Sequence, residues 1–229
     1  MIKKQINQKD SFDIELLNSI GYDYVFNNSP INRLKNKINT PNKLDKNKHE
    51  KLLKLKQEID SIKDCKLKKN ASRIVFADGN IQSSIMIVGE GPGQKEDELG
   101  KPFVGDAGNL LNKMLNAIKI ERKKVYITNV VNYRPPNDRK PESNEINRYS
   151  EFLKEHISII NPKILILMGS TAMEAILGSN TKISNERGKW KEIIIKQKNY
   201  KTIVTFHPSY LLRKPDQKKI FLGRFKNYS

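Results

Sequence analysis

The sequence predicts an α/β fold with three layers, in which a central, mostly parallel sheet of four strands lies between helices. From Ile74 onward, short runs rich in apolar residues alternate with longer runs whose apolar residues recur at helical intervals. Most of the short runs are almost continuously apolar, which is typical of parallel strands covered by helices on both faces. The connections between these runs are short, as they are in sheets built from strand–helix–strand units.

The expected elements follow one another along the chain. The predicted strands are IMIVGE (85–90), VYITNVV (125–131), KILILMG (163–169) and KTIVTF (201–206). The predicted helices contain AGNLLNKMLNAI, ESNEINRYSEFLKEHISII and STAMEAIL, and Ser170 is the expected N-cap of the last. In a parallel sheet, ligand sites form at the carboxyl ends of the strands. Residues 89–93, 128–134 and 207–213 are therefore expected to meet at one edge.

The first part of the chain differs in composition from the rest. Residues 1–60 are rich in Lys and Asn and have little apolar periodicity outside FDIELLNSIGYDYVF, although an amphipathic helix is expected just before Cys65. We expect an extension at 1–60, partly helical or disordered, followed by one domain at 61–229. The extension has three open interpretations: it holds DNA, contacts a replication or repair protein, or has no fixed structure.

Composition limits the classes of partner and location. The net charge of +18 over 229 residues suits a polyanion such as nucleic acid, but the abundance of Lys, Asn and Ile also fits a biased codon supply. No apolar run has membrane-spanning length and residues 1–10 are polar, so we expect a cytoplasmic monomer that makes no membrane contact. A single cysteine, Cys65, excludes an internal disulfide and cannot hold a metal cluster by itself.

Each of the three segments has both a structural and a functional interpretation. GEGPG is a tight turn, but its glycines also let a ligand approach closely. A carboxylate at the end of a buried strand, such as Glu90, costs free energy unless it is paired or has a function. Asn129 either caps a turn or offers an acceptor and a donor to one edge of a base. His207 is either structural or catalytic, and the leucines that follow it are suited to insertion between bases.

Taken together, three motifs closely resemble the family 4 uracil-DNA glycosylases. They are GEGPGQKEDELGKPFVG, VYITNVVNYRPPNDRKP and HPSYLLRKP, in this order and spacing, and NASRIVFADGN and ISNERGKW are also similar to family sequence. The resemblance extends from about Cys65 to the end of the chain. It implies a uracil-DNA glycosylase-like fold and a monofunctional enzyme that flips uracil out of DNA, hydrolyses its bond to deoxyribose and leaves an abasic site.

The resemblance also implies roles for individual residues. Glu90 would stabilise the sugar cation and activate water, and His207 would donate a hydrogen bond to uracil O2. Phe103 would stack on the uracil ring, while Asn129 would pair with the O4 and N3 edge and reject cytosine. The remaining substrate-binding positions are Gly89, Gly91, Pro92 and Gly93, and the DNA-binding positions are Arg134, Ser209, Leu211 and Arg213, with Leu211 filling the hole in the duplex.

One departure from the family concerns its iron–sulfur cluster. Family 4 enzymes usually carry this cluster on four cysteines, and the matching positions here are Ile62, Cys65, Tyr133 and Tyr149. With one thiol left, we expect no cluster, no other metal, and apolar packing in the vacated volume. The chain also has no long insert with an additional His between KPFVG and RPP, so we expect no covalent trapping of DNA.

Two alternatives to this function stay open at the level of sequence. The first is a glycosylase with shifted base specificity, for hypoxanthine or mismatched thymine, because sequence does not fix the geometry that reads the base. The second is a non-catalytic DNA-binding module of the same fold, which would bind DNA in a salt-sensitive way without releasing a base.

Overall fold

A six-stranded sheet forms the centre of the computed structural model, which describes residues 43–217. The strands are β1 (Ala77–Gly79), β2 (Ile85–Gly89), β3 (Tyr126–Asn129), β4 (Ile164–Met168), β5 (Trp190–Ile195) and β6 (Lys198–Thr205). Their order is β1-β3-β2-β4-β6-β5, in which β3, β2, β4 and β6 are parallel and the two edge strands are antiparallel to their neighbours.

The sequence predicted four strands, whereas the sheet has six, because the two edge strands β1 and β5 were not predicted. The four predicted strands are the parallel ones, whose runs are apolar because both of their faces are covered. β1 has only three residues, and in β5 exposed or half-exposed residues precede a single buried one, Ile195. Neither strand therefore has the continuous apolar run on which the prediction relied.

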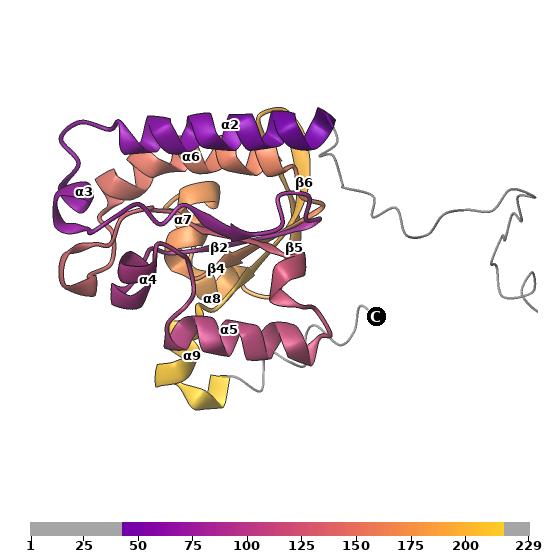
Figure 1. Cartoon of the computed structure of the whole chain (residues 1–229). Helices are drawn as coiled ribbons and strands as arrows, with labels where there is room; N and C mark the ends of the chain where they lie inside the picture. The colour runs from indigo at the N-terminus through magenta and orange to yellow at the C-terminus, as the bar shows by residue number, and fades with distance from the viewer. Residues whose placement is uncertain (1–42, 218–229) are drawn as a thin grey trace, which may run out of the picture. The chain divides into compact units, whose positions relative to one another are not determined.

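Helices cover both faces of the sheet. They are α2 (Lys43–Asp60), α3 (Lys66–Asn70), α4 (Gln94–Leu99), α5 (Asp106–Ala117), α6 (Ser143–Ile160), α7 (Ser170–Leu177), α8 (Ile183–Glu186) and α9 (Pro208–Arg213), with short 3-10 turns η1 (Arg122–Lys124), η2 (Pro136–Asp138) and η3 (Pro215–Gln217). α2 and α6 lie together above the sheet, and α5 and α9 lie together below it (Figure 1). The predicted three-layer α/β/α arrangement is confirmed.

The alternation of side chains along the parallel strands builds two cores. Met86 and Val88 point into a large cluster that includes buried residues of α2, α6 and α7. Ile87, between them, points to the other face and packs with Leu111 and Leu115 of α5. Because successive strand residues face opposite sides, a strand between two helical layers needs apolar residues at every position.

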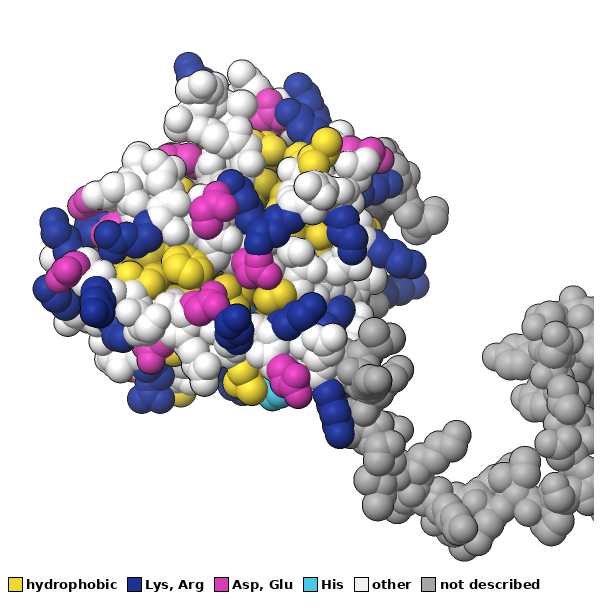
Figure 2. Space-filling model, turned by 90° about the horizontal axis from the view of Figure 1, so that it is seen from above, with side chains coloured by type: hydrophobic (Ala, Val, Ile, Leu, Met, Phe, Trp, Pro, Cys, Tyr) yellow, Lys and Arg dark blue, Asp and Glu magenta, His cyan; other side chains and the backbone are white. Residues whose placement is uncertain are grey.

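The amphipathic helix α2 is part of this fold. Its residues Leu52, Leu55 and Ile59 are buried in the same cluster as α6, and the compact unit begins at Pro41. The domain therefore starts before residue 61, the boundary expected from composition. The face over α2 carries Lys and Arg with Asp and Glu interspersed, which fits the interpretation of its lysines as a solvated surface (Figure 2). The interpretations of residues 1–42 lie outside the described residues.

The connections bring four strand ends to one edge of the sheet, which we call the carboxyl edge. β3 lies beside β2, and α6 then carries the chain across to β4 on the other side of β2, so the strand order reverses at β2. Gly89 lies opposite Asn129, and Met168 lies opposite Thr205. The three predicted segments therefore meet, together with the start of α7.

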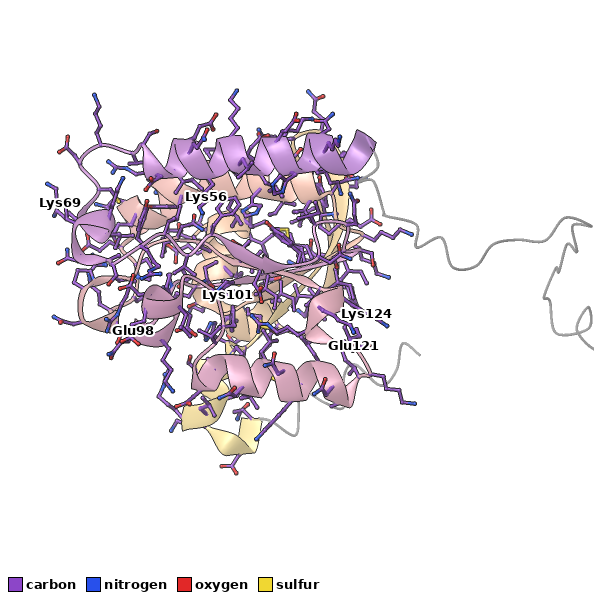
Figure 3. The ribbon with its side chains drawn as sticks, in the orientation of Figure 1. Lys56, Lys69, Glu98, Lys101, Glu121 and Lys124 are labelled. Carbon is purple, nitrogen blue, oxygen red and sulfur yellow. The ribbon has the colours of Figure 1, made fainter. Side chains whose placement is uncertain are left out.

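The opposite edge of the sheet carries ion pairs on the surface. Glu121 pairs with Lys123 at 2.7 Å and with Lys124 at 3.6 Å, where the chain enters β3. Figure 3 shows Glu121 and Lys124 on the opposite side of the molecule from Glu98 of α4. Within residues 43–217, no helix combines the length and the apolar character needed to cross a membrane.

Candidate active site

Glu90 follows β2 directly, and its carboxylate is held by the first turn of α7. Thr171 Oγ1 donates a hydrogen bond to Glu90 Oε2 at 2.5 Å, and Thr171 itself is fully buried. The N-terminus of a helix carries a partial positive charge that favours a carboxylate. The backbone is fixed as well, because the Val131 N–H donates to Glu90 O at 3.2 Å. Glu90 is thus a half-exposed, oriented carboxylate.

Gly89 allows an aromatic ring and an amide to converge at the end of β2. A Cβ added at Gly89 would lie 2.4 Å from Asn129 Oδ1 and 2.5 Å from Phe103 Cζ, so any side chain would collide with both. Asn129 is 3% exposed, and its Oδ1 accepts no hydrogen bond from residues 43–217. A buried acceptor without a partner is costly. It is explained if a ligand supplies the donor.

Phe103 is fixed in a strained loop by two buried or half-buried charges. Its φ of 53° lies in the left-handed region, which a bulky residue adopts only when its surroundings enforce it. Glu96 Oε1 accepts from the Val104 and Gly105 N–H groups, both at 2.8 Å. Arg122 donates to Phe103 O at 2.9 Å and to Pro102 O at 2.7 Å. These contacts present the ring of Phe103 beside Asn129.

His207 precedes α9, and its environment fixes both its charge and its tautomer. The pKa of His207 is lowered to about 4, mainly by burial and also by the nearby positive charge of Arg213. The imidazole is therefore neutral at pH 7. Its Nδ1 accepts the Ser209 N–H at 3.2 Å, so the proton of the neutral ring lies on Nε2. His207 thus offers one N–H donor.

A groove extends from Glu90 and His207 along α8 and α9, and we call it the α8–α9 groove. It has a volume of about 500 Å³ and is lined by Glu90, Gly169, Ser170, Ile183, Ser184, Phe206, His207, Ser209, Tyr210 and Arg213. The ring of His207 also lies 5.4 Å from that of Phe103, between centroids. His207 approaches β4 closely because Gly169 has no Cβ, which would lie 3.1 Å from His207 Cβ. Glu90 and His207 therefore share one groove, and Phe103 lies near both His207 and Asn129.

The structure alters the interpretation of several predicted residues. Leu211 is 1% exposed and faces inward on α9, which packs against α5, whereas Leu212 is 40% exposed. This burial does not favour the entry of Leu211 into the duplex, and its role there stays a prediction. Arg134 is engaged in a bidentate ion pair with Asp138, with distances of 2.7 and 3.0 Å. Ser209 and Arg213 line the groove, and their contact with DNA stays a prediction.

The turn after β2 also differs from its expected form. Gly89, Gly91 and Gly93 have no positive φ. Glycine is needed at position 89 because Asn129 and Phe103 approach its backbone closely, not because of an unusual backbone angle. Pro92 is buried, and Gly93 is the N-cap of α4. Gly169 rather than Ser170 is the N-cap of α7.

Comparison with known proteins decides the family. The sequence model of the Uracil DNA glycosylase superfamily matches residues 76–226. The chain belongs to this superfamily. It is 42% identical to the Type-4 uracil-DNA glycosylase of Sulfurisphaera tokodaii over 183 residues, which cover 76% of this chain and 82% of that protein.

Two further Type-4 uracil-DNA glycosylases support the same assignment. The protein of Thermotoga maritima is 43% identical over 150 residues, which cover 65% of this chain and 77% of that protein. The protein of Archaeoglobus fulgidus is 37% identical over 174 residues, which cover 74% of this chain and 87% of that protein. The family indicated by the three motifs is confirmed.

The residues at the family's cluster positions do not fit an iron–sulfur cluster. Tyr133 and Tyr149 are at most 2% exposed and pack with Cys65 in the main core, with Ile62 against it. Cys65 Sγ lies 3.4 Å from Tyr149 Oη, and Tyr133 Oη donates to Asp60 Oδ1 at 2.6 Å. A pocket of about 140 Å³ lies against Cys65 and Tyr149. The four positions supply one thiol, whereas such a cluster needs four. Within residues 43–217, no group of three or more His, Cys, Asp and Glu could hold a metal ion.

Three residues that support this glycosylase site were missed by the sequence analysis. Glu96 lies inside the first motif, but its acidic neighbours gave no reason to single it out. Thr171 follows Ser170 in a segment interpreted only as a helix start. Arg122 belongs to the run ERKK, which has the composition of a solvated surface. Their importance comes from contacts between segments distant in sequence.

Proposed function

We propose that this protein is a monofunctional uracil-DNA glycosylase of base excision repair, which hydrolyses the N-glycosidic bond of deoxyuridine in DNA and leaves an abasic site. The Type-4 uracil-DNA glycosylases among its relatives support this activity. The observation that carries the proposal is the buried Oδ1 of Asn129, which has no hydrogen-bond partner in the part of the chain that the structure describes and lies next to the ring of Phe103. Uracil has the N3–H donor that this acceptor lacks and a planar ring to cover Phe103.

Recognition of the base follows from these two groups. The target nucleotide leaves the duplex stack and its base lies on Phe103. Asn129 Oδ1 accepts the N3–H, and Asn129 Nδ2 donates to O4. Cytosine presents an acceptor at N3 and an amino group at C4, so its pattern is opposite to that of uracil. If cytosine entered the site, the buried amide would be left unpaired. The cost of this unpaired amide leads to the rejection of cytosine.

The chemistry uses Glu90 and His207 on opposite sides of the breaking bond. The C1′–N1 bond breaks, its electron pair moves to uracil, and positive charge develops on the deoxyribose. Glu90 stabilises this charge and accepts a proton from the water that attacks C1′. The Nε2–H of His207 donates to O2 of the departing uracil anion, and its neutral form fits a hydrogen-bond donor rather than a proton donor.

The test is the release of uracil from a labelled oligonucleotide, detected by alkaline cleavage at the abasic site. We expect cleavage at the single uracil and little at hypoxanthine or mismatched thymine offered in competition. Faster release of either competitor would replace the proposal by a glycosylase of shifted specificity. Binding of DNA without release of any of these bases would replace it by a non-catalytic module.

On duplex DNA, the exposed Leu212 takes the role that sequence gave to Leu211. Leu212→Ala is expected to lower uracil excision from a duplex about 10-fold, because filling the vacated stack offsets part of the cost of extruding the base. Single-stranded DNA has no such hole, so excision from it should change little. Rates on the two substrates, measured under single-turnover conditions, check this expectation.

Leu211→Ala is the matched control for Leu212→Ala. Because Leu211 is 1% exposed, its truncation removes core packing and should lower the free energy of unfolding by about 2–5 kcal/mol. A duplex-specific loss of excision in Leu211→Ala, with Leu212→Ala unaffected, would restore Leu211 as the inserted side chain.

We also propose that the protein works without an iron–sulfur cluster, since only one of the four corresponding positions, Cys65, has a thiol that could hold it. Protein produced in iron-depleted medium is expected to be colourless, to contain no iron and to excise uracil as fast as protein produced with iron. Cys65→Ala should keep this activity, because the thiol lies in the core and, within residues 43–217, its polar contact is a weak one to Tyr149. Visible absorbance, elemental analysis and excision rates check the three expectations. Brown protein with several irons per chain would contradict the proposal.

The remaining proposals concern location and partners. All the proposed catalytic groups come from one chain, so the proposed chemistry needs no second copy, and we propose that the protein acts on DNA as a monomer in the cytoplasm. The Lys- and Asn-rich composition of residues 1–42 supports a contact with DNA or with a replication or repair protein.

A further inference from the structure

The α8–α9 groove extends beyond the groups that the proposed chemistry uses. Besides Glu90 and His207, its walls include Ile183 and Ser184 of α8 and Tyr210 of α9. Its volume of about 500 Å³ lies within the range of sites that hold a small molecule the size of a nucleotide. The uracil ring itself is assigned to Phe103 and Asn129, so the groove is left for another part of the DNA.

Two aromatic side chains, Phe206 and Tyr210, pack against each other along this groove. The rings of Tyr210 and Phe206 lie 4.6 Å apart between centroids, at an angle of 42°. The guanidinium of Arg187 lies 4.6 Å from the centroid of the Phe206 ring. Tyr210 is 37% exposed and is one of the more exposed large apolar side chains among the described residues. Phe206 thus supports a ring that remains accessible from the groove.

We propose that Tyr210 is a stacking platform for a nucleobase next to the extruded uridine, on the same strand. This inference rests on the proposed function. Every base has a π-face, so an accessible aromatic ring with a cationic side chain nearby suits single-stranded nucleic acid. The exposed Arg213 and the hydroxyl groups of Ser184 and Ser209 line the same groove and suit the adjacent phosphate. The location beside Glu90 fits a nucleotide joined directly to the one that reacts.

The proposal predicts a loss of affinity that depends on one base of the substrate. The probe is a short single-stranded oligonucleotide with one uracil, in normal form and with its two neighbouring nucleotides replaced by abasic analogues. Tyr210→Ala is expected to weaken binding of the normal oligonucleotide at least about 5-fold, the lower end for stacking between an aromatic residue and a base. On the probe with abasic neighbours, Tyr210→Ala and the unchanged chain should bind alike, because that probe has no base to stack.

Control variants separate stacking from other effects. Tyr210→Phe keeps the ring and should bind both probes like the unchanged chain. Leu53→Ala removes an apolar side chain of similar exposure, 47%, from α2 and should also change nothing.

The outcomes distinguish this inference from the proposed function. Equal affinity of Tyr210→Ala and the unchanged chain for the normal probe overturns the platform, as does an equal loss on both probes, which indicates a structural role. Failure of the unchanged chain to release uracil overturns the proposed function, while the comparison of affinities still tests whether Tyr210 stacks on a neighbouring base.

Discussion

Glu90→Ala is expected to lower the single-turnover rate of uracil excision by about 10²- to 10⁴-fold, the range for a positioned general base. The variant loses the carboxylate that faces the developing sugar cation and accepts the proton of the attacking water. Affinity for uracil-containing DNA should not fall, because the substitution removes a negative charge from a site that meets phosphates. Single-turnover excision assays and fluorescence anisotropy with a labelled oligonucleotide measure the two quantities.

Thr171 supplies a graded control for the same site. Thr171→Val removes the hydroxyl that donates to Glu90 at 2.5 Å while it keeps the shape of the side chain, so we expect a loss of about 10-fold in rate. Thr171→Ser restores a donor and should recover most of that loss. An unchanged rate in Glu90→Ala would show that another group activates the water. An unchanged rate in Thr171→Val would limit Thr171 to a structural role.

The parts of the fold that depend on local pattern could be predicted from the sequence. The four parallel strands have apolar runs because both faces of each strand are buried, as Met86, Ile87 and Val88 illustrate by pointing to alternate cores. The same topology implies that their carboxyl ends meet, and Glu90 and His207 do line one groove. The roles of these two side chains remain proposals.

The parts that depend on distant contacts could not be predicted. Leu211 and Leu212 are adjacent and chemically identical, and only the packing of α9 buries the first and exposes the second. Composition assigned α2 to an extension, because a short apolar stripe among many lysines does not reveal that α6 covers it. The support of the Phe103 loop by Arg122 depends on a residue 19 positions away.

Asn129→Asp is expected to change which base the enzyme accepts. The substitution replaces the Nδ2–H₂ donor by an oxygen, so uracil O4 meets an acceptor and loses its hydrogen bond, while the amino group of cytosine gains one. We expect uracil excision to fall by about 10²- to 10³-fold, as when one preorganised donor is removed from an active site. Cytosine excision should rise from background, and the ratio of the two rates, measured on matched oligonucleotides, should fall by at least about 10³-fold.

Asn129→Asp both loses a hydrogen bond to uracil and gains one to cytosine. Asn129→Leu is the control that has only the loss. Leucine fills a similar volume without polar atoms, so uracil excision should fall while cytosine excision stays at background. If Asn129→Asp and Asn129→Leu behave alike, the amide contributes affinity for uracil but does not select it. If Asn129→Asp still rejects cytosine and excises uracil at the original rate, Asn129 does not read the base. Its unpartnered Oδ1 would then require a different ligand, such as a bound water.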